Sequence, residues 1–414
     1  MIRNTIFFLL IGIIFIGMIS PATAQSFFSS RGFGERTDYT SAQAIGIGGA
    51  NIALPDQFQI NTLNPATLVN INLSRLSGDF IHQSFWTTSP EGSGFSKYNN
   101  LNGISLAIPL KVNRLVVAAG LTPFSQFDYS FDESGVIDDY HYQKIVEGEG
   151  GLNKIHVGFG STIFKRISLG AYFNYYFGKM TKKWRVDYVS DLFWDTSDDI
   201  VRKVWGSSFT FGVNINPISS LYLGGFFTPQ HELTYRDAVQ FGTQKGSYFN
   251  KLMDYELEEQ KMTMPEMWGT GAVFTAKNRY RFAASYLLEP WSKFDGSGII
   301  ANELQDRYRF SVGMELLPSN NLVAKYHEKM TYRAGYFYQQ LNFTDEDGQA
   351  IKEYGFSLGF GFPYYSGKGR VDLALQYGKR GGLSSDSVKE NVFQVYISVI
   401  AGEKWFVRRN RNTE

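Results

Sequence analysis

The chain has 414 residues, 43% of them hydrophobic and 16% aromatic, yet its mean hydropathy is only -0.21. Beyond the N-terminus no apolar run is long enough for a membrane-spanning helix, so a helical membrane protein is not expected. There are no cysteines, which excludes a disulfide framework and thiolate chemistry. The formal charge is +1 and falls to zero without the first 24 residues, which argues against nucleic acid as a partner.

Residues 1–24 have the features of a secretory signal peptide. Arg3 gives the positive start, an apolar stretch runs from Ile6 to Ile19, and Ala22-Thr23-Ala24 is a small-x-small cleavage site. An uncleaved anchor helix is the alternative, but Ser20-Pro21 ends the apolar run early. We therefore expect cleavage after Ala24 and a location in the outer membrane of a Gram-negative bacterium.

The next segment, residues 25–70, differs from the rest of the chain. It begins with aromatic residues among serines and glycines, continues through a small-residue stretch from Ser41 to Ala53, and ends near Asn64-Pro65. Asn-Pro favours a turn, and we expect these two residues to lead into the first strand. The segment has too many apolar residues for a solvated tail, so we expect a plug, or hatch, that folds inside something larger.

From Ile71 onward the sequence alternates in the manner of β-strands. Between Tyr354 and Phe362 every second residue is large and apolar, and each residue between is Gly or Ser. A strand projects successive side chains to opposite faces, so one face is apolar and the other nearly bare. The strands are predicted near 71–85, 98–109, 113–124, 151–164, 166–180, 204–216, 220–236, 257–276, 279–293, 305–317, 328–343, 351–362, 370–381 and 391–406.

This pattern predicts an all-β fold, a transmembrane antiparallel β-barrel of about 14 strands over residues 71–406, with the hatch in its lumen and a basic tail at 407–414. The apolar faces would meet lipid. Short turns alternate with long polar segments, and long loops on one side are typical of the outer side of such barrels. The long loops are predicted near 125–150, 181–203, 237–256 and 294–304. They are acidic in places but lack EF-hand spacing, so we expect no metal site.

Two spaced motifs point to a known family. Met264-Pro265-Glu266-Met267-Trp268 opens one strand, and the next strand ends in Trp291-Ser292-Lys293-Phe294. With the Asn64-Pro65-Ala66 turn, these motifs resemble the FadL-type outer-membrane transporters, as a distant Bacteroidetes-like member. The resemblance implies a fourteen-stranded barrel closed by an N-terminal hatch. The resemblance also implies that Pro265, Glu266, Trp268 and Trp291, the residues that match the family motifs, have a structural role.

The resemblance implies passive uptake of hydrophobic small molecules, long-chain fatty acids or aromatic hydrocarbons, gated by the hatch. The family's carboxylate-binding basic residues have no identified match here, so the cargo stays open. The candidate binding residues are aromatics of the hatch and of the inward strand faces: Phe27, Phe28, Phe33, Tyr172, Tyr176, Tyr222 and Phe226. The four strand residues could equally pack against the plug. Because a related branch serves protein secretion in gliding bacteria, the alternative is a non-transporting barrel that acts as a partner in secretion or in outer-membrane structure.

Catalysis is not expected. The five histidines, His82, His141, His156, His231 and His327, are scattered and form no cluster with zinc-site spacing, and His156 on the presumed lumen face has no nearby serine nucleophile motif. We therefore expect no catalytic residues and no cofactor. The expected partners are outer-membrane lipid, a hydrophobic small-molecule cargo, and the barrel-assembly and periplasmic chaperone machinery.

Overall fold

A computed structural model describes residues 26–405, apart from positions 91, 138, 191, 246–247, 296–303, 320, 322, 346–347 and 382–387. The expected signal peptide and the basic tail lie outside the described residues. In this described part, no helix has both the length and the apolar character needed to cross a membrane.

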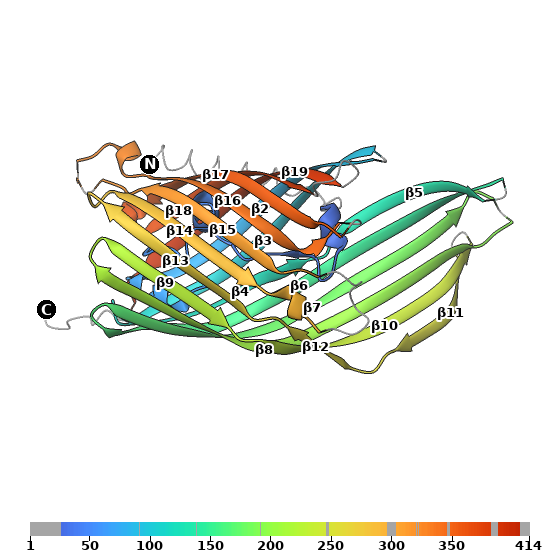
Figure 1. The fold of residues 1–414 in the computed structure, drawn as a ribbon, viewed down its shortest axis with the longest axis horizontal. Helices are drawn as coiled ribbons and strands as arrows, with labels where there is room; N and C mark the ends of the chain where they lie inside the picture. Colours follow the sequence, from blue (N-terminus) through green and yellow to red (C-terminus); the bar gives the residue numbers. More distant parts are fainter. Residues whose placement is uncertain are drawn as a thin grey trace, which may run out of the picture.

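The chain forms a closed antiparallel barrel of 14 strands, which confirms the predicted fold class (Figure 1). The last strand pairs with the first along its whole length, and this pairing closes the wall. The wall strands are β2 (Ser74–Ser89), β3 (Gly92–Lys111), β4 (Leu115–Gln126), β6 (Tyr140–Phe164), β7 (Ile167–Tyr188), β8 (Asp195–Ile218), β9 (Leu221–Thr228), β13 (Met267–Ala276), β14 (Tyr280–Glu289), β15 (Arg307–Leu316), β16 (Thr331–Thr344), β17 (Ala350–Tyr364), β18 (Gly369–Gly381) and β19 (Lys389–Glu403).

The alternation in β17 decides which side faces out. Phe356 and Leu358 are 63% and 52% exposed, whereas Ser357 between them is 3% exposed. Large apolar side chains on the outside and small ones on the inside are the arrangement of a barrel wall in lipid. The orientation predicted for this strand is therefore confirmed.

Aromatic side chains form a row across four neighbouring wall strands. The register places Tyr286 of β14 beside Phe310 of β15, then Tyr338 of β16 and Tyr354 of β17. Phe310 and Tyr354 are exposed on the outer surface. Such a girdle is typical of the level where a barrel leaves the hydrocarbon region.

Two of the predicted strands are interrupted by proline. The predicted strand 220–236 divides into β9 and β10 (His231–Lys245) around Pro229, and 257–276 divides into β12 (Gln260–Met264) and β13 around Pro265. Proline has no N–H to donate to a ladder. The pairing resumes on each side, since β9 pairs with β13 and β10 pairs with β12.

The prediction of polar loops at 125–150, 181–203 and 237–256 is wrong, because these segments are mostly strand. They form β5 (Tyr129–Ile137), β11 (Tyr248–Glu256) and long extensions of β6, β7, β8 and β10. Together the strand residues within 129–150, 180–203 and 235–256 that the structure describes make a six-stranded sheet in the order β5-β6-β7-β8-β10-β11. Figure 1 shows this sheet, which we call the wing, projecting from one end of the barrel.

The polarity of each face reverses where the barrel becomes the wing. Because of this reversal, the sequence pattern did not predict the wing strands. In β7 the outward side chain Phe173 is apolar, but further along the same face Lys183 and Arg185 are charged. The inward face changes in the opposite sense, from Asn174 to Trp184. An exterior in lipid needs apolar side chains and an exterior in water does not, so the membrane ends between these positions.

Substitution by arginine at two similarly exposed positions, one in the barrel and one in the wing, should distinguish a side chain in lipid from one in water. Leu358 in the barrel is 52% exposed and Val136 in the wing is 56% exposed. We expect Leu358→Arg to destabilise the barrel by roughly 2–4 kcal/mol, because the charge enters the hydrocarbon region. Val136→Arg should change the free energy of unfolding by less than about 0.5 kcal/mol. Urea unfolding in lipid vesicles, followed by heat-modifiable gel mobility, measures both, and equal losses would contradict the membrane boundary.

Candidate functional site: the lumen and the N-terminal segment

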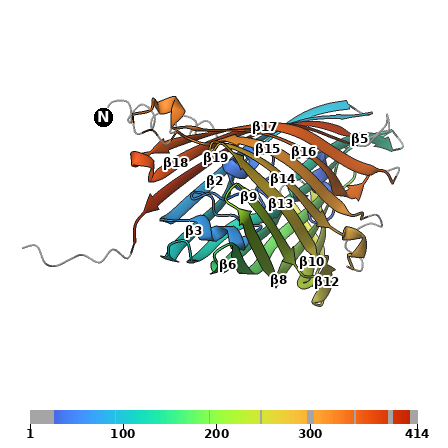
Figure 2. The same ribbon diagram turned by 60° about the vertical axis from the view of Figure 1, so that its left-hand side comes forward.

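The N-terminal segment, residues 26–71, lies inside the barrel. It contains η1 (Phe27–Ser30), β1 (Glu35–Arg36), α2 (Ala42–Gly46) and η2 (Pro65–Asn70). Pro65 packs on inward glycines of β6 and β7, whereas Ile47 packs on inward glycines of β15 and β16. These strand pairs lie on opposite sides of the ring. A segment that touches both must cross the lumen, as Figure 2 shows for the blue ribbon.

The bare faces of the wall strands make room for this segment. A Cβ atom at Gly335 would lie 2.2 Å from the backbone nitrogen of Gly48, and one at Gly359 would lie 2.8 Å from the Cα of Gly46. Ser357 is also small, and its hydroxyl donates to the Gly46 carbonyl. The glycine and serine face of β17 is therefore the surface on which α2 rests, and only residues without a larger side chain fit there.

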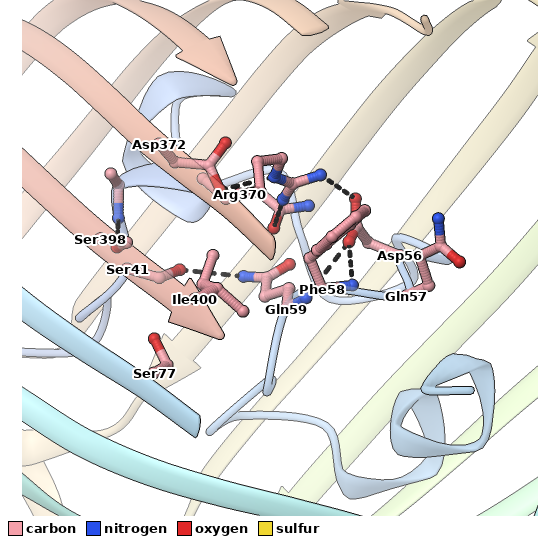
Figure 3. Close-up of polar contacts among 12 residues, drawn as sticks. Ser41, Asp56, Gln57, Phe58, Gln59, Ser77, Arg370, Asp372, Ser398 and Ile400 are labelled. Carbon is pink, nitrogen blue, oxygen red and sulfur yellow. Dashed lines mark hydrogen bonds and ion pairs between the residues drawn. The ribbon is translucent and has the colours of Figure 1, made fainter. Parts of the chain in front are cut away.

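Arg370 of β18 joins the wall to the segment (Figure 3). Its guanidinium donates to Gln43 at 2.6 Å and to Asp56 at 3.3 Å, both in the segment, and to Asp372 of its own strand at 2.7 Å. Asp56 also accepts the backbone N–H of Phe58 at 2.6 Å. All of these groups are buried, so each charge depends on the others for compensation.

Two more wall arginines hold the two remaining carboxylates of the segment. Arg380 binds Glu35 at 2.8 Å and also Glu390 at 2.7 Å. Arg307 binds Asp38, and it reaches Glu289 of the wall at 3.3 Å. With Arg370, three inward arginines therefore pair with the three acidic residues of the segment, Glu35, Asp38 and Asp56.

Arg309 is a fourth inward arginine, and it has no carboxylate partner among the described residues. It donates to the Gly48 carbonyl at 3.1 Å and to Gln339 at 3.0 Å. Its guanidinium carbon lies 4.9 Å from the ring centre of Tyr39 and 4.0 Å from that of Phe337. Backbone oxygen and aromatic faces thus compensate part of this charge.

The segment also bridges an opening in the wall. Pairing between β3 and β4 ends at Ile104 and Leu121. Beyond that point β1 pairs with β4 at Ser125 and Gln126, and the side-chain amide of Asn102 in β3 donates to the Thr40 carbonyl at 2.8 Å. Residues 35–40 therefore connect two wall strands that no longer pair with each other.

A cavity with a volume of about 70 Å³ lies beside this bridge. This is well below the roughly 300 Å³ of the smaller ligand pockets. Its walls are mainly polar, and none of the seven aromatic residues predicted to bind cargo lines it. The polar residues that line the cavity include Glu35, Arg36, Asp38, Tyr39, Arg307, Arg309, Gln339, Glu353, Gln376, Gln394 and Tyr396.

The predicted hatch aromatics lie at the wing end of the lumen. The ring of Phe28 stacks on that of Phe343 with centres 5.9 Å apart, and Phe27 lies 5.2 Å from Phe131 of β5. Phe33 belongs to a buried apolar cluster, which we call the upper cluster. Its buried members are Phe33, Phe124, Phe127, Tyr129, Leu152, Tyr176, Met180, Val204, Leu233, Tyr235, Met262, Met264 and Trp291.

The four predicted strand aromatics point inward, and three of them meet the segment. The hydroxyl of Tyr172 donates to the Asn61 carbonyl at 3.0 Å, and Phe226 packs in one cluster with Ile52. Tyr222 packs against a cluster that includes Ile47, Ala50, Ala53 and Leu54 of the segment. Tyr176 belongs to the upper cluster. Their contacts are those of packing, and their role in binding cargo stays a prediction.

Asn64 and Pro65 form the turn at the other end of the segment. The Asn64 side chain accepts the N–H of Ala66 at 3.1 Å, and its amide donates to the carbonyls of Ile52 at 2.9 Å and Val213 at 3.1 Å. Pro65 is the first residue of η2, where a missing N–H costs nothing. Asn64 thus ties two parts of the segment to β8.

The two family motifs lie together at the rim of the barrel. Glu266, which follows Pro265, pairs with Lys293 of the second motif at 3.0 Å. Trp291 is buried in the upper cluster, whereas Trp268 packs on the outside with its ring 5.8 Å from that of Tyr286. The motifs therefore hold the rim around η3 (Trp291–Lys293).

The inward arginines were not among the residues predicted from the sequence, although a signal for them exists. In Tyr308-Arg309-Phe310-Ser311-Val312 the alternation places Arg309 on the same face as Ser311. That face is the lumen face, because Phe310 is exposed on the outside. An arginine at an inward position of a wall strand needs a partner, which the N-terminal segment supplies.

Asp56→Asn should loosen the segment without removing its local turn. The amide oxygen can still accept the N–H groups of Phe58 and Gln59, but the charge facing Arg370 is lost. We expect a loss of about 1.5–3 kcal/mol in the local stability of residues 41–60. Hydrogen exchange in that range should then be at least tenfold faster. Asp237→Asn is the matched control, since it breaks the Arg202 ion pair in the wing and should leave 41–60 unchanged.

Acid should release the segment only at low pH. Burial would raise the pKa of Asp38, but Arg307 and Arg36 outweigh burial and lower this pKa from 3.8 to about 2. A carboxyl group whose pKa is lowered contributes fully above its ordinary pKa and loses that contribution as the pH falls toward the lowered value. Ion conductance in planar bilayers should therefore stay constant from pH 8 to 4 and rise below about pH 3. A rise between pH 7 and 5 would show that another group controls the segment.

Solved structures of channels share this architecture. The chain is 12% identical to a FadL homologue of Pseudomonas aeruginosa, with a TM-score of 0.61 over 90% of this chain and 99% of that one. It is 14% identical to the CymD monoaromatic hydrocarbon channel, with a TM-score of 0.57 over 88% and 98% of the two chains. It is also 14% identical to the toluene transporter TbuX of Ralstonia pickettii, with a TM-score of 0.55 over 88% and 98%.

At these low sequence identities the structural likeness shows only a shared fold. It therefore confirms that the fold resembles that of FadL-type barrels. A Bacteroidetes origin stays a prediction. The named neighbours are channels and transporters, which is consistent with the expectation that the chain is not an enzyme. No curated protein sequence matches the chain. One family model matches residues 1–412, and its family name differs from that of the structural neighbours: the chain belongs to the BamG family.

Proposed function

We propose that the chain is an outer-membrane channel for passive uptake of hydrophobic small molecules, long-chain fatty acids or aromatic hydrocarbons, with the N-terminal segment as its hatch. The observation that carries this proposal is the position of residues 35–40, which bridge the two wall strands β3 and β4 where these no longer pair. A segment in that place controls both the lumen and the wall. The shared fold with the hydrocarbon channels supports the same reading.

The proposed route begins at the upper cluster, where aromatic and methionine side chains gather at the mouth of the barrel. These side chains are buried, and the methionines among them can repack around apolar cargo of varied shape. Phe33 links this cluster to the hatch, so cargo that displaces Phe33 would also disturb Glu35 and Asp38. Withdrawal of residues 35–40 would then open a path sideways between β3 and β4 into the bilayer. Movement along this route is diffusion, driven by the cargo gradient.

A second candidate is a non-transporting barrel that acts as a partner in protein secretion or in outer-membrane structure. It is favoured by the three buried arginine–carboxylate links to the segment and by the small polar cavity beside them. A hatch held in this way opens only at a cost, since release breaks three buried ion pairs. A barrel of this kind needs a fixed core and no tunnel.

Deletion of residues 27–62 tests whether the segment closes the lumen. The barrel should still fold, because the wall strands pair with one another along a closed ring. In planar bilayers the shortened protein should conduct ions continuously, whereas the intact protein should be nearly closed. The variant should also lose saturable uptake of hydrophobic cargo. If it conducts no more than the intact protein, the segment is not a hatch.

Uptake measured with the intact protein separates the two candidates. Vesicles carrying the reconstituted barrel should take up oleate or toluene faster than empty vesicles, with a rate that saturates. Asp56→Asn should raise this rate, because the hatch is held less firmly, while Asp237→Asn should not. If no cargo enters faster than through empty vesicles, the transport proposal fails and the partner function is retained.

A further inference from the structure

Three lysines gather on neighbouring strands of the barrel wall, and we call them the lysine triangle. Lys352 of β17 and Lys389 of β19 both lie beside Gly381 of β18 in register, one on each side of it. Lys379 precedes Gly381 by two residues, so it is a diagonal neighbour of both. Diagonal positions across an antiparallel pair are roughly 7–8 Å apart, within reach of long side chains. The three ammonium groups can therefore meet at one point.

The lysine triangle is on the outer surface of the wall, because the residue that follows each lysine points inward. Glu353, Arg380 and Glu390 are all buried. Arg380 binds Glu390 at 2.7 Å and lies 3.9 Å from Glu353. Successive side chains of a strand point to opposite faces, so the two acids serve Arg380 on the lumen side and not the lysines on the other.

The charge of the lysine triangle is not compensated within the described part of the chain. None of its three members forms an ion pair there, although two of them are exposed and the third is half-buried. Exposed lysines of the wing differ, since Lys144 pairs with Glu133 at 3.3 Å and Lys183 with Glu149 at 3.5 Å. Like charges on one face of a sheet repel each other. A bound anion would remove this repulsion.

The lysine triangle lies where the wall leaves the hydrocarbon region. Lys379 is the register neighbour of Tyr354, which belongs to the aromatic girdle. Lys352 and Lys389 lie one step further toward the wing end of their strands. Tyr377, two residues from Lys379 on the same face, is also exposed. Aromatic side chains of this kind sit at the level of the lipid head groups, so the lysines beside them meet those head groups.

The centre of the lysine triangle has no side chain. A Cβ atom at Gly381 would lie 3.0 Å from the Cγ of Lys389, so the stem of this lysine already extends over the glycine. A larger residue at position 381 would fill the space between the three ammonium groups. Glycine leaves that space open to a group that approaches from the bilayer.

We propose that the lysine triangle binds the phosphate group of a lipid in the leaflet at the wing end. Lysine is a common ligand of phosphate, and a lipid presents its phosphate at this level while its acyl chains lie along the apolar wall. Long segments mark the outer side of such barrels, and the phosphorylated lipid of the outer leaflet of an outer membrane is lipid A. The inference does not depend on transport, because the site is outside the lumen.

Lipid binding to the full-length protein in dodecyl maltoside micelles tests the proposal. The probe is fluorescently labelled lipid A, followed by fluorescence anisotropy. Unlabelled lipid A should displace it at least tenfold more effectively than lipid A from which the phosphate has been removed. Sodium phosphate at 10 mM should displace it no better than sodium chloride of equal ionic strength, because a free anion has no acyl chains. Binding should weaken as salt is raised from 50 to 500 mM.

A matched pair of triple variants tests the location. Lys352→Gln, Lys379→Gln and Lys389→Gln together should weaken binding at least tenfold, whereas arginine at all three positions should retain it. The control is Lys144→Gln, Lys183→Gln and Lys251→Gln, which removes the same charge from wing lysines that have carboxylate partners. It should change binding less than twofold.

Heat-modifiable gel mobility verifies that each variant is folded. Equal losses in the two glutamine variants would overturn the proposal, as would equal displacement by dephosphorylated lipid A. Specific displacement by sodium phosphate would also overturn it, because that result assigns the lysine triangle to a soluble anion.

Discussion

A guanidinium buried away from water needs a carboxylate or comparable partner, and the lumen of this barrel is built around that requirement. The wall supplies Arg307, Arg370 and Arg380, and the N-terminal segment supplies one carboxylate for each. Removal of one partner from a buried pair costs about 3–5 kcal/mol. Each of these arginines also has a carboxylate partner in the wall, Glu289, Asp372 or Glu390, so the wall keeps its own charge compensation. It is the three buried acids of the segment that depend on the wall arginines.

The barrel and its orientation followed from the sequence because a strand in lipid has a strict period of two. Between Tyr354 and Phe362 the pattern is complete, and both the direction of Leu358 and the bare opposite face agree with the structure. The fit of Gly46 against Gly359 was not predictable, since it joins residues more than three hundred positions apart. The same holds for Asp56 and Arg370, which are separated by 314 positions. Alternation gives the face of a residue but not its partner.

The wing was missed for a different physical reason. Its strands have the same period of two, but their charged side chains raise the local polarity to that of a loop. In the segment from Lys183 to Tyr188, charged and apolar residues alternate, with Trp184 and Val186 on one face and Lys183 and Arg185 on the other. Polarity averaged over such a stretch suggests solvent, whereas the alternation itself indicates a strand with one wet face.

One strand therefore carries two opposite solvation patterns. Along β7 the outward face passes from Phe173 to Lys183 and the inward face from Asn174 to Trp184, without a change of register. In the barrel, lipid accepts the apolar side and the N-terminal segment occupies the polar one. In the wing, water accepts the charged side, and no described layer of this chain covers the end of the apolar one. The lumen thus finds its partner groups within the chain, whereas apolar side chains at the end of the wing stay exposed in the described part of the chain. The same alternation therefore gives a filled interior where the segment supplies complementary groups, and a bare apolar face where no described segment does.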